Sequence, residues 1–166
     1  FNNTCVNNNI TLMNEMGFTV SDYVVNYKKA LKTAIKENLA SLKNITLLTS
    51  PKKYANEDPK VLTDGALGGN SFYSNWLGFE GNDLNAVVDL DQIKEIKSIS
   101  INFLQVTNHI VFFPEQVEFL HSDDNLKWKS LGKAFNKFDL SPKSKVNDIQ
   151  TFSIDAKNLK TRYIKI

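Results

Sequence analysis

The sequence contains a single cysteine, Cys5, among its 166 residues. One cysteine excludes an internal disulfide and a zinc site built from several cysteines. The sequence also lacks a large excess of charge, because 20 lysine and arginine residues stand against 18 aspartate and glutamate residues, for a net charge of +2. So small a net charge creates no strong field toward a polyanion, and we therefore expect neither nucleic acid nor an anionic membrane as a partner.

Long apolar runs are missing as well. No run of about 18 apolar residues is present that would predict a transmembrane helix. The first residues, FNNT, open directly into polar sequence and lack the charged and then apolar pattern of a secretion signal. We therefore expect any export signal to lie upstream of this sequence.

Recognisable catalytic motifs are absent too. The chain has only two histidines, which fall in different expected elements, and no nucleophile elbow, phosphate-binding loop or dinucleotide fingerprint is present. The adjacent carboxylates Asp123 and Asp124 lie in a segment typical of a tight turn between two strands. The sequence thus predicts a domain that is not an enzyme. A catalytic role would need Glu80, Asp83 and His109 to converge in a deep cleft.

The N-terminal part of the chain divides into two segments. Residues 1–20 are rich in asparagine and weakly patterned, which predicts a linker or the remnant of a preceding domain. Residues 21–43 have apolar side chains at three- and four-residue spacing, which predicts an amphipathic α-helix. Packing against the sandwich or a neighbouring domain, or dimerisation, would bury its apolar stripe, which consists of Tyr23, Tyr27, Leu31, Ala34, Ile35, Leu39 and Leu42.

From residue 44 onward the pattern predicts β-structure. Short segments rich in β-branched and aromatic residues alternate with turn-forming loops, without a helix between successive segments. This arrangement is typical of an antiparallel sandwich and not of a parallel βαβ fold. The expected strands lie at residues 45–49, 85–90, 96–105, 116–122, 128–131, 150–154 and 162–166. The sequence therefore predicts an all-β sandwich over residues 44–166, preceded by an N-terminal α-helix.

One set of motifs is more specific than the general pattern. It comprises LTDG at 62–65, WLGFEGNDL at 76–84 and VVDL at 87–90. These motifs resemble the discoidin or coagulation factor V/VIII type C domain, a group that includes carbohydrate-binding module family 32. The segments at 99–105, 111–114 and 117–124 resemble more narrowly the copies of this domain appended to bacterial family 20 β-N-acetylhexosaminidases. The resemblance implies a jelly-roll sandwich of the galactose-binding-domain type.

The resemblance also implies a structural Ca²⁺ site. In this family the aspartate–glycine turn commonly helps to bind calcium, a hard cation that prefers carboxylate and carbonyl oxygens. Asp64 would supply the carboxylate, and main-chain carbonyls of the loop through Asn70 would assist. An aspartate–glycine turn without any ion fits the same residues. The family normally continues through one more loop and strand beyond Ile166, so we expect the domain to be truncated at its C-terminus.

Sugar recognition in such modules combines an aromatic face with planar polar groups. The resemblance places these groups in the loops at 72–82 and 106–113. Trp76 also fits a core position, and Leu104 and Gln105 stand where galactose-binding members often have an arginine. The expected sugar-binding residues are Tyr73, Trp76, Phe79, Glu80, Gln105, Asn108, His109 and Phe112.

The function expected from the resemblance is that of an accessory module. It would be a non-catalytic carbohydrate-binding domain of a secreted, periplasmic or cell-surface bacterial glycoside hydrolase similar to a β-hexosaminidase. Its partners would be glycans containing GlcNAc, GalNAc or galactose, and an upstream catalytic domain of the same chain. The alternative is a structural or interaction domain of the same enzyme that does not bind sugar.

Overall fold

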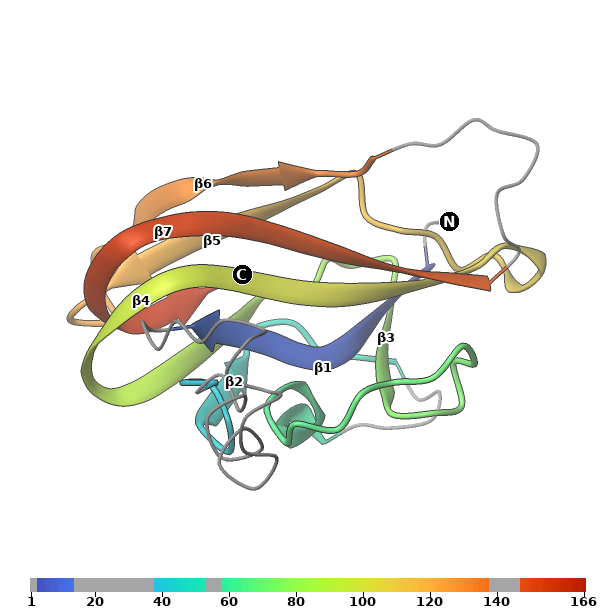
Figure 1. The fold of residues 1–166 in the computed structure, drawn as a ribbon. Coiled ribbons are helices and arrows are strands. Elements are labelled where there is room, and N and C mark those ends of the chain that lie inside the picture. Colours follow the sequence, from blue (N-terminus) through green and yellow to red (C-terminus); the bar gives the residue numbers. More distant parts are fainter. Residues whose placement is uncertain (1–2, 14–37, 53–57, 138–146) are drawn as a thin grey trace, which may run out of the picture.

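The computed structural model describes residues 3–13, 38–52, 58–137 and 147–166. Within these ranges seven strands form antiparallel pairs only (Figure 1), which confirms the all-β sandwich predicted from the sequence. No helix in the described part is long and apolar enough to cross a membrane. The elements are β1 (Asn3–Met13), β2 (Asn44–Leu47), η1 (Pro59–Leu62), β3 (Trp76–Glu80), β4 (Ala86–Val106), η2 (Thr107–His109), β5 (Gln116–Ser122), β6 (Lys129–Phe135) and β7 (Asn147–Lys165), where η denotes a 3₁₀-helix.

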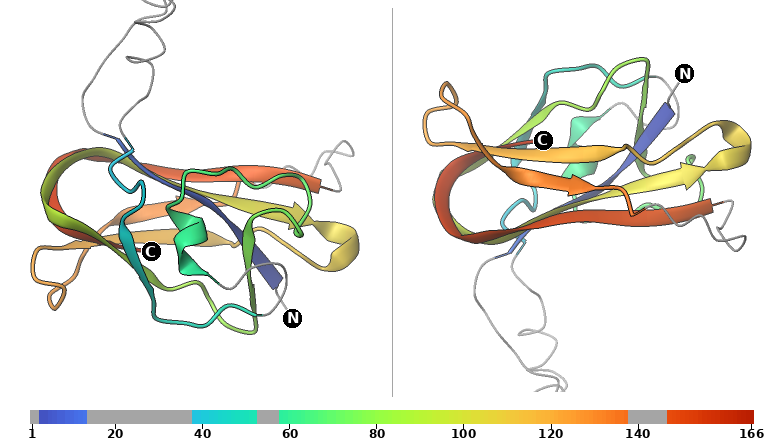
Figure 2. Two further views of the ribbon diagram at one scale, coloured as in Figure 1. Left: turned by 90° about the horizontal axis from the view of Figure 1, so that it is seen from below. Right: turned by 90° about the horizontal axis from the view of Figure 1, so that it is seen from above.

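Two long strands, β4 and β7, curl round at one end and so belong to both layers of the sandwich (Figure 2). Their pairing runs from Val87 opposite Lys165 to Val106 opposite Asn147, with one register shift between Asp89 and Lys94 and another between Ile96 and Ser98. The first layer has the order β3, β1, second half of β4, first half of β7. The second layer has the order β2, first half of β4, second half of β7, β5, β6.

The main core lies between the two layers. Along β4, the side chains of Ile99, Ile101 and Phe103 are buried and alternate with more exposed polar residues, as expected for a strand with one face in the core. The ring of Phe103 meets that of Phe152 on β7 edge-on, with centroids 5.1 Å apart. Phe119 on β5 closes the core from the second layer. The alternation in the sequence therefore identified the buried face of β4 correctly.

A second, smaller cluster lies on the outer face of the first layer. Leu104 and Val106 alternate with the core residues of β4, so their side chains point away from the main core. Trp76 and Val111 pack with them, and Phe72 and Ile149 lie at the margin. The side chains of this cluster come from β3, β4, β7 and the loops that precede β3 and follow η2. It therefore holds those two loops against the end of the first layer.

The N-terminal segments differ from the sequence-based expectation. Residues 3–13, expected to be a linker or a remnant of another domain, form β1 between β3 and β4, because backbone hydrogen bonds to two strands compensate for a weak side-chain pattern. Of the helix predicted over 21–43, residues 21–37 lie outside the described residues, whereas residues 39–42 form turns and not a helix. Leu39 is buried and Leu42 is 82% exposed with a φ of 57°, so the two do not share an apolar stripe. The domain boundaries themselves stay a prediction.

Two ion pairs lie at the edge where the paired strands bend. Arg162 on β7 donates two hydrogen bonds to the carboxylate of Asp89 on β4, from Nε at 2.8 Å and from Nη2 at 2.9 Å. Beside it, Lys43 Nζ lies 2.5 Å from Asp91 Oδ2. The hydrogen bond from Arg162 is the main reason why the pKa of Asp89 is lowered from its usual 3.8. This bidentate pair therefore joins β4 to β7 most firmly when Asp89 is ionised.

The lowered pKa of Asp89 predicts a dependence of stability on pH. A carboxyl group whose pKa is lower in the folded than in the unfolded state stabilises the fold at neutral pH, and this contribution is lost as pH falls through the folded-state pKa. We therefore expect the free energy of unfolding to fall less between about pH 5 and about pH 2 in Asp89→Asn than in the wild type. Urea denaturation at a series of pH values measures this difference.

The matched control for this experiment is Asp123→Asn. Asp123 is an exposed carboxylate with no hydrogen-bond partner among the described residues. Its substitution should leave the pH dependence of the free energy of unfolding close to that of the wild type. Equal slopes for the wild type and Asp89→Asn would contradict the assignment.

Candidate functional site

The loop between η1 and β3 is held across the end of the first layer by side-chain hydrogen bonds to its carbonyl groups. Trp76 Nε1 donates to the carbonyl oxygen of Gly69 at 2.9 Å, and Asn147 Nδ2 donates to that of Asn70 at 2.9 Å. Because Asn147 is the first residue of β7, the second bond ties the loop to a distant strand. The loop is therefore fixed at both the β3 and the β7 side of the layer.

The loop after β4 is a short turn closed by its own backbone. Val106 and Val111 exchange two hydrogen bonds, with N to O distances of 2.9 Å and 3.2 Å. Between them η2 presents exposed side chains, and Ile110 adopts a left-handed conformation with φ 59° and ψ 32°. A left-handed conformation is costly for a β-branched residue, so the two valine hydrogen bonds and the burial of Val111 hold the turn in place. The turn thereby projects Asn108 and His109 beside the neighbouring loop.

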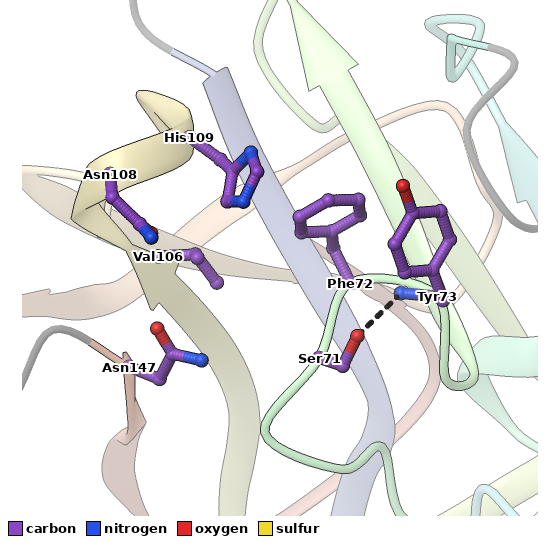
Figure 3. Close-up of a pocket in the computed structure, with 7 residues that line it drawn as sticks. All are labelled: Ser71, Phe72, Tyr73, Val106, Asn108, His109 and Asn147. Atoms are coloured by element: carbon purple, nitrogen blue, oxygen red, sulfur yellow. Dashed lines mark hydrogen bonds between the residues drawn. The ribbon is translucent and has the colours of Figure 1, made fainter.

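A cleft of about 140 Å³ lies between these two loops (Figure 3). Phe72 forms its apolar wall, with its ring centroid 4.3 Å from that of Tyr73 and 5.0 Å from that of His109. Tyr73 is 76% exposed, so one face of its ring is open to a ligand. The residues that line the cleft are Ser71, Phe72, Tyr73, Val106, Asn108, His109 and Asn147.

The polar groups of the cleft are partly uncommitted. Ser71 Oγ accepts a hydrogen bond from the backbone N–H of Tyr73 at 3.4 Å. By contrast, the side chains of Asn108 and His109 have no hydrogen-bond partner among the described residues. A carboxamide and an imidazole each offer both a donor and an acceptor. The cleft therefore combines an aromatic wall with polar groups that are available to a small polar ligand.

The structure brings together three of the eight predicted sugar-binding residues, namely Tyr73, Asn108 and His109, which all line the cleft. The prediction is wrong for Trp76 and Phe79, because both side chains are only 1% exposed and their rings belong to the apolar clusters. The other predicted residues, Glu80, Gln105 and Phe112, do not line the cleft.

Four lining residues were missed by sequence reasoning: Ser71, Phe72, Val106 and Asn147. Phe72 and Val106 lie at the ends of the two predicted binding loops, so the loops were identified although these residues were not. Asn147 lies far along the chain and reaches the cleft only because β7 pairs with β4, with Asn147 opposite Val106. No local pattern marks it as a ligand-binding residue.

The three residues of the catalytic alternative do not meet in this cleft. Of Glu80, Asp83 and His109, only His109 lines the cleft. Asp124 acts as the turn residue expected from the sequence: its Oδ1 accepts hydrogen bonds from the backbone N–H groups of Lys127 at 2.8 Å and Leu126 at 2.9 Å. These bonds lower the pKa of Asp124 to about 2. This carboxylate therefore stays ionised near neutral pH and stabilises the turn.

The predicted calcium ligands lie in the loop that precedes β3. Asp64 Oδ1 accepts a hydrogen bond from Ala66 N at 2.8 Å, and the carbonyl oxygen of Asn70 accepts one from Asn147. Among the described residues, no three His, Cys, Asp or Glu side chains gather that could hold a metal ion. The oxygens of this loop suit calcium in kind, since each carbonyl oxygen keeps a second lone pair, but the ion would have one carboxylate and complete its shell with carbonyls and water.

Comparison with known proteins identifies a family for most of the chain. Residues 44–166 match the family described as the F5/8 type C domain, and this segment is more than half of the chain. No curated protein matches the chain significantly. The match begins at the first residue of β2 and includes all seven residues of the cleft.

The anchoring of the cleft loop by Trp76 predicts an asymmetry between the two tryptophans of the chain. Trp76→Phe removes the hydrogen bond to Gly69 and part of a buried ring, and should lower the free energy of unfolding by about 1–3 kcal/mol. Trp128→Phe is the matched control, because Trp128 is half-buried and its ring interacts with Lys165 Nζ at 5.4 Å. Chemical denaturation should show a smaller loss for the control, and equal losses would contradict the anchoring role.

Proposed function

We infer the function of this chain from one premise: it belongs to the F5/8 type C, or discoidin, domain family. Domains of this family are generally not catalytic, and they commonly bind carbohydrate or mediate interactions. The seven-residue cleft places the exposed ring of Tyr73 near the side chains of Asn108 and His109, which have no hydrogen-bond partner among the described residues.

We propose that the protein binds the end of a glycan in this cleft. The observation that carries the proposal is the juxtaposition of the rings of Phe72 and Tyr73 with the side chains of Asn108 and His109, which have no partner among the described residues. An aromatic ring packs against the apolar C–H face of a sugar, while carboxamide and imidazole groups bond its hydroxyls. A cleft of about 140 Å³ suits part of one sugar residue and not an extended chain.

An accessory role follows from the size of such a site. A small, open cleft with few hydrogen bonds binds weakly, at about the millimolar level. Weak binding becomes useful when the module is tethered to another domain, because tethering raises the effective concentration of the second domain at the glycan. We therefore propose that the module raises the concentration of an attached enzyme on its substrate.

The identity of that enzyme is a finer proposal. We propose a bacterial glycoside hydrolase similar to a family 20 β-N-acetylhexosaminidase, secreted, periplasmic or at the cell surface, with its catalytic domain upstream in the same chain. The support is the resemblance of the segments at 99–105, 111–114 and 117–124 to domains appended to such enzymes. The expected glycans contain GlcNAc, GalNAc or galactose.

The sugar proposal predicts a localised NMR response. Titration with GlcNAc, GalNAc and galactose should shift the signals of residues 71–73, 106–109 and 147. Tyr73→Ala should weaken binding by about 1 kcal/mol, because it removes one aromatic face. The control is Phe135→Ala, which removes a ring that is 62% exposed on β6 and outside the cleft.

Two outcomes would contradict this proposal. If none of the three sugars shifts any signal, the chain is an interaction domain without a sugar site. If Tyr73→Ala and Phe135→Ala bind sugar equally well, the ligand contacts another part of the surface.

We also propose that the loop at Asp64 binds Ca²⁺ and that the ion stabilises the fold. A ligand that binds only the folded state raises the melting temperature in proportion to the logarithm of its concentration above the dissociation constant. Millimolar CaCl₂ should therefore raise the melting temperature of the wild type and not that of Asp64→Asn. Asp58→Asn is the matched control, because Asp58 Oδ1 likewise accepts a backbone N–H two residues on, at 2.9 Å from Lys60 N. A calcium shift that survives in Asp64→Asn would refute this site.

A further inference from the structure

Asn147 occupies a distinctive position in the cleft. It is the first residue of β7 and pairs with Val106, the last residue of β4. Its side chain reaches the loop that precedes β3, with Nδ2 2.9 Å from the carbonyl oxygen of Asn70. Thus one side chain contacts the opposite loop and also lines the cleft.

The hydrogen bond to Asn70 fixes the orientation of the Asn147 carboxamide, that is, which way its nitrogen and its oxygen point. In a carboxamide the nitrogen is the donor and the oxygen is the acceptor. Because the nitrogen bonds to the carbonyl of Asn70, a rotation that exchanges the two atoms would place two acceptors against each other. Figure 3 shows the oxygen of Asn147 on the side toward Val106 and Asn108. The group therefore presents a fixed acceptor to the cleft.

We propose that Asn147 determines which sugars the cleft accepts. Its oxygen accepts a hydrogen bond from one sugar hydroxyl. The seven lining side chains carry no permanent positive charge, and the cleft selects uncharged sugars over acidic ones. This inference rests on the proposed glycan site and adds a specificity that the site's aromatic wall does not provide, because stacking discriminates poorly between sugars with similar apolar faces.

The rejection of acidic sugars depends on the orientation of the Asn147 carboxamide and on the charge of the lining side chains. An ionised carboxylate is an acceptor only, so it has no favourable bond to the Asn147 oxygen. The seven lining side chains are those of one serine, one phenylalanine, one tyrosine, one valine, two asparagines and one histidine, which supply no permanent positive charge. A carboxylate that enters the cleft thus loses hydration without an ionic partner from these residues, at a substantial cost in binding free energy.

The experiment pairs one substitution with modified sugars. The tightest binder among galactose, GlcNAc and GalNAc is titrated at pH 8 by NMR, together with its monodeoxy analogues and its 6-carboxylate form. In the wild type one monodeoxy analogue should bind about 3- to 10-fold more weakly than the parent sugar, as expected for the loss of one hydrogen bond. In Asn147→Ala that penalty should disappear while the penalties of the other analogues persist. The 6-carboxylate form should bind the wild type at least about tenfold more weakly than the parent sugar.

Asn82→Ala is the matched control. Asn82 also donates its Nδ2 to a loop carbonyl, that of Ser50 at 3.0 Å, but does not line the cleft. This variant should keep the wild-type penalty for every analogue.

The outcomes separate the two proposals. If Asn147→Ala weakens the parent sugar and all analogues by one common factor, Asn147 only holds the loop and the specificity role is overturned. Binding of the 6-carboxylate form as tightly as the parent sugar would overturn the selection of uncharged sugars. Failure of every sugar to bind the wild type would instead refute the glycan site itself, before any variant is compared.

Discussion

The antiparallel pairing of β4 with β7 is the interaction on which the rest of the structure depends. The pair runs through both layers, and its bend creates the space that the main core fills. The ladder ends at Val106 opposite Asn147, and both residues of this last pair line the cleft. A slip of one residue in this register would turn the core face of β4 outward and would move Asn147 away from Asn70. The core and the site therefore share one structural determinant.

The two faces of β4 pack against different parts of the structure in the first layer. One face contributes Ile99, Ile101 and Phe103 to the core of the sandwich. The opposite face contributes Leu104 and Val106, which pack against Trp76 and its neighbours. That outer cluster excludes water from beneath the two loops and so gives them a fixed base. Trp76 has two roles: its ring packs in the cluster, and its indole N–H donates a hydrogen bond to the carbonyl oxygen of Gly69. A rigid base of this kind lets a small cleft keep its shape without a bound ligand.

Much of the fold could be predicted from the sequence, whereas less of the site could. Alternation along residues 96–105 identified a half-buried strand, because side chains on opposite faces of a strand meet different surroundings. Tyr73, Asn108 and His109 were among the expected sugar-binding residues because they lie in turn-rich loops next to motifs of the family, and all three line the cleft. Trp76 and Phe79 lie in the same region, but Trp76 is buried with Leu104 and Val106 of β4, and Phe79 belongs to the cluster that includes Val61 and Leu62 of η1, partners that no local pattern reveals. β1 was missed because its asparagine-rich sequence has no strand periodicity and its pairing partners are distant along the chain.

The sequence by itself determined the class of the fold, the family and the two loops that form the cleft. These properties depend on local composition and on the order of short motifs, which a linear chain displays directly. Only the tertiary structure decided which side chains meet in the cleft, that Trp76 supports the site from beneath, and that Asn147 joins it. These properties depend on strand register and on hydrogen bonds between segments far apart in the chain, such as that from Asn147 to Asn70. A local residue pattern does not show which distant segments will lie side by side, because that depends on how the strands pair.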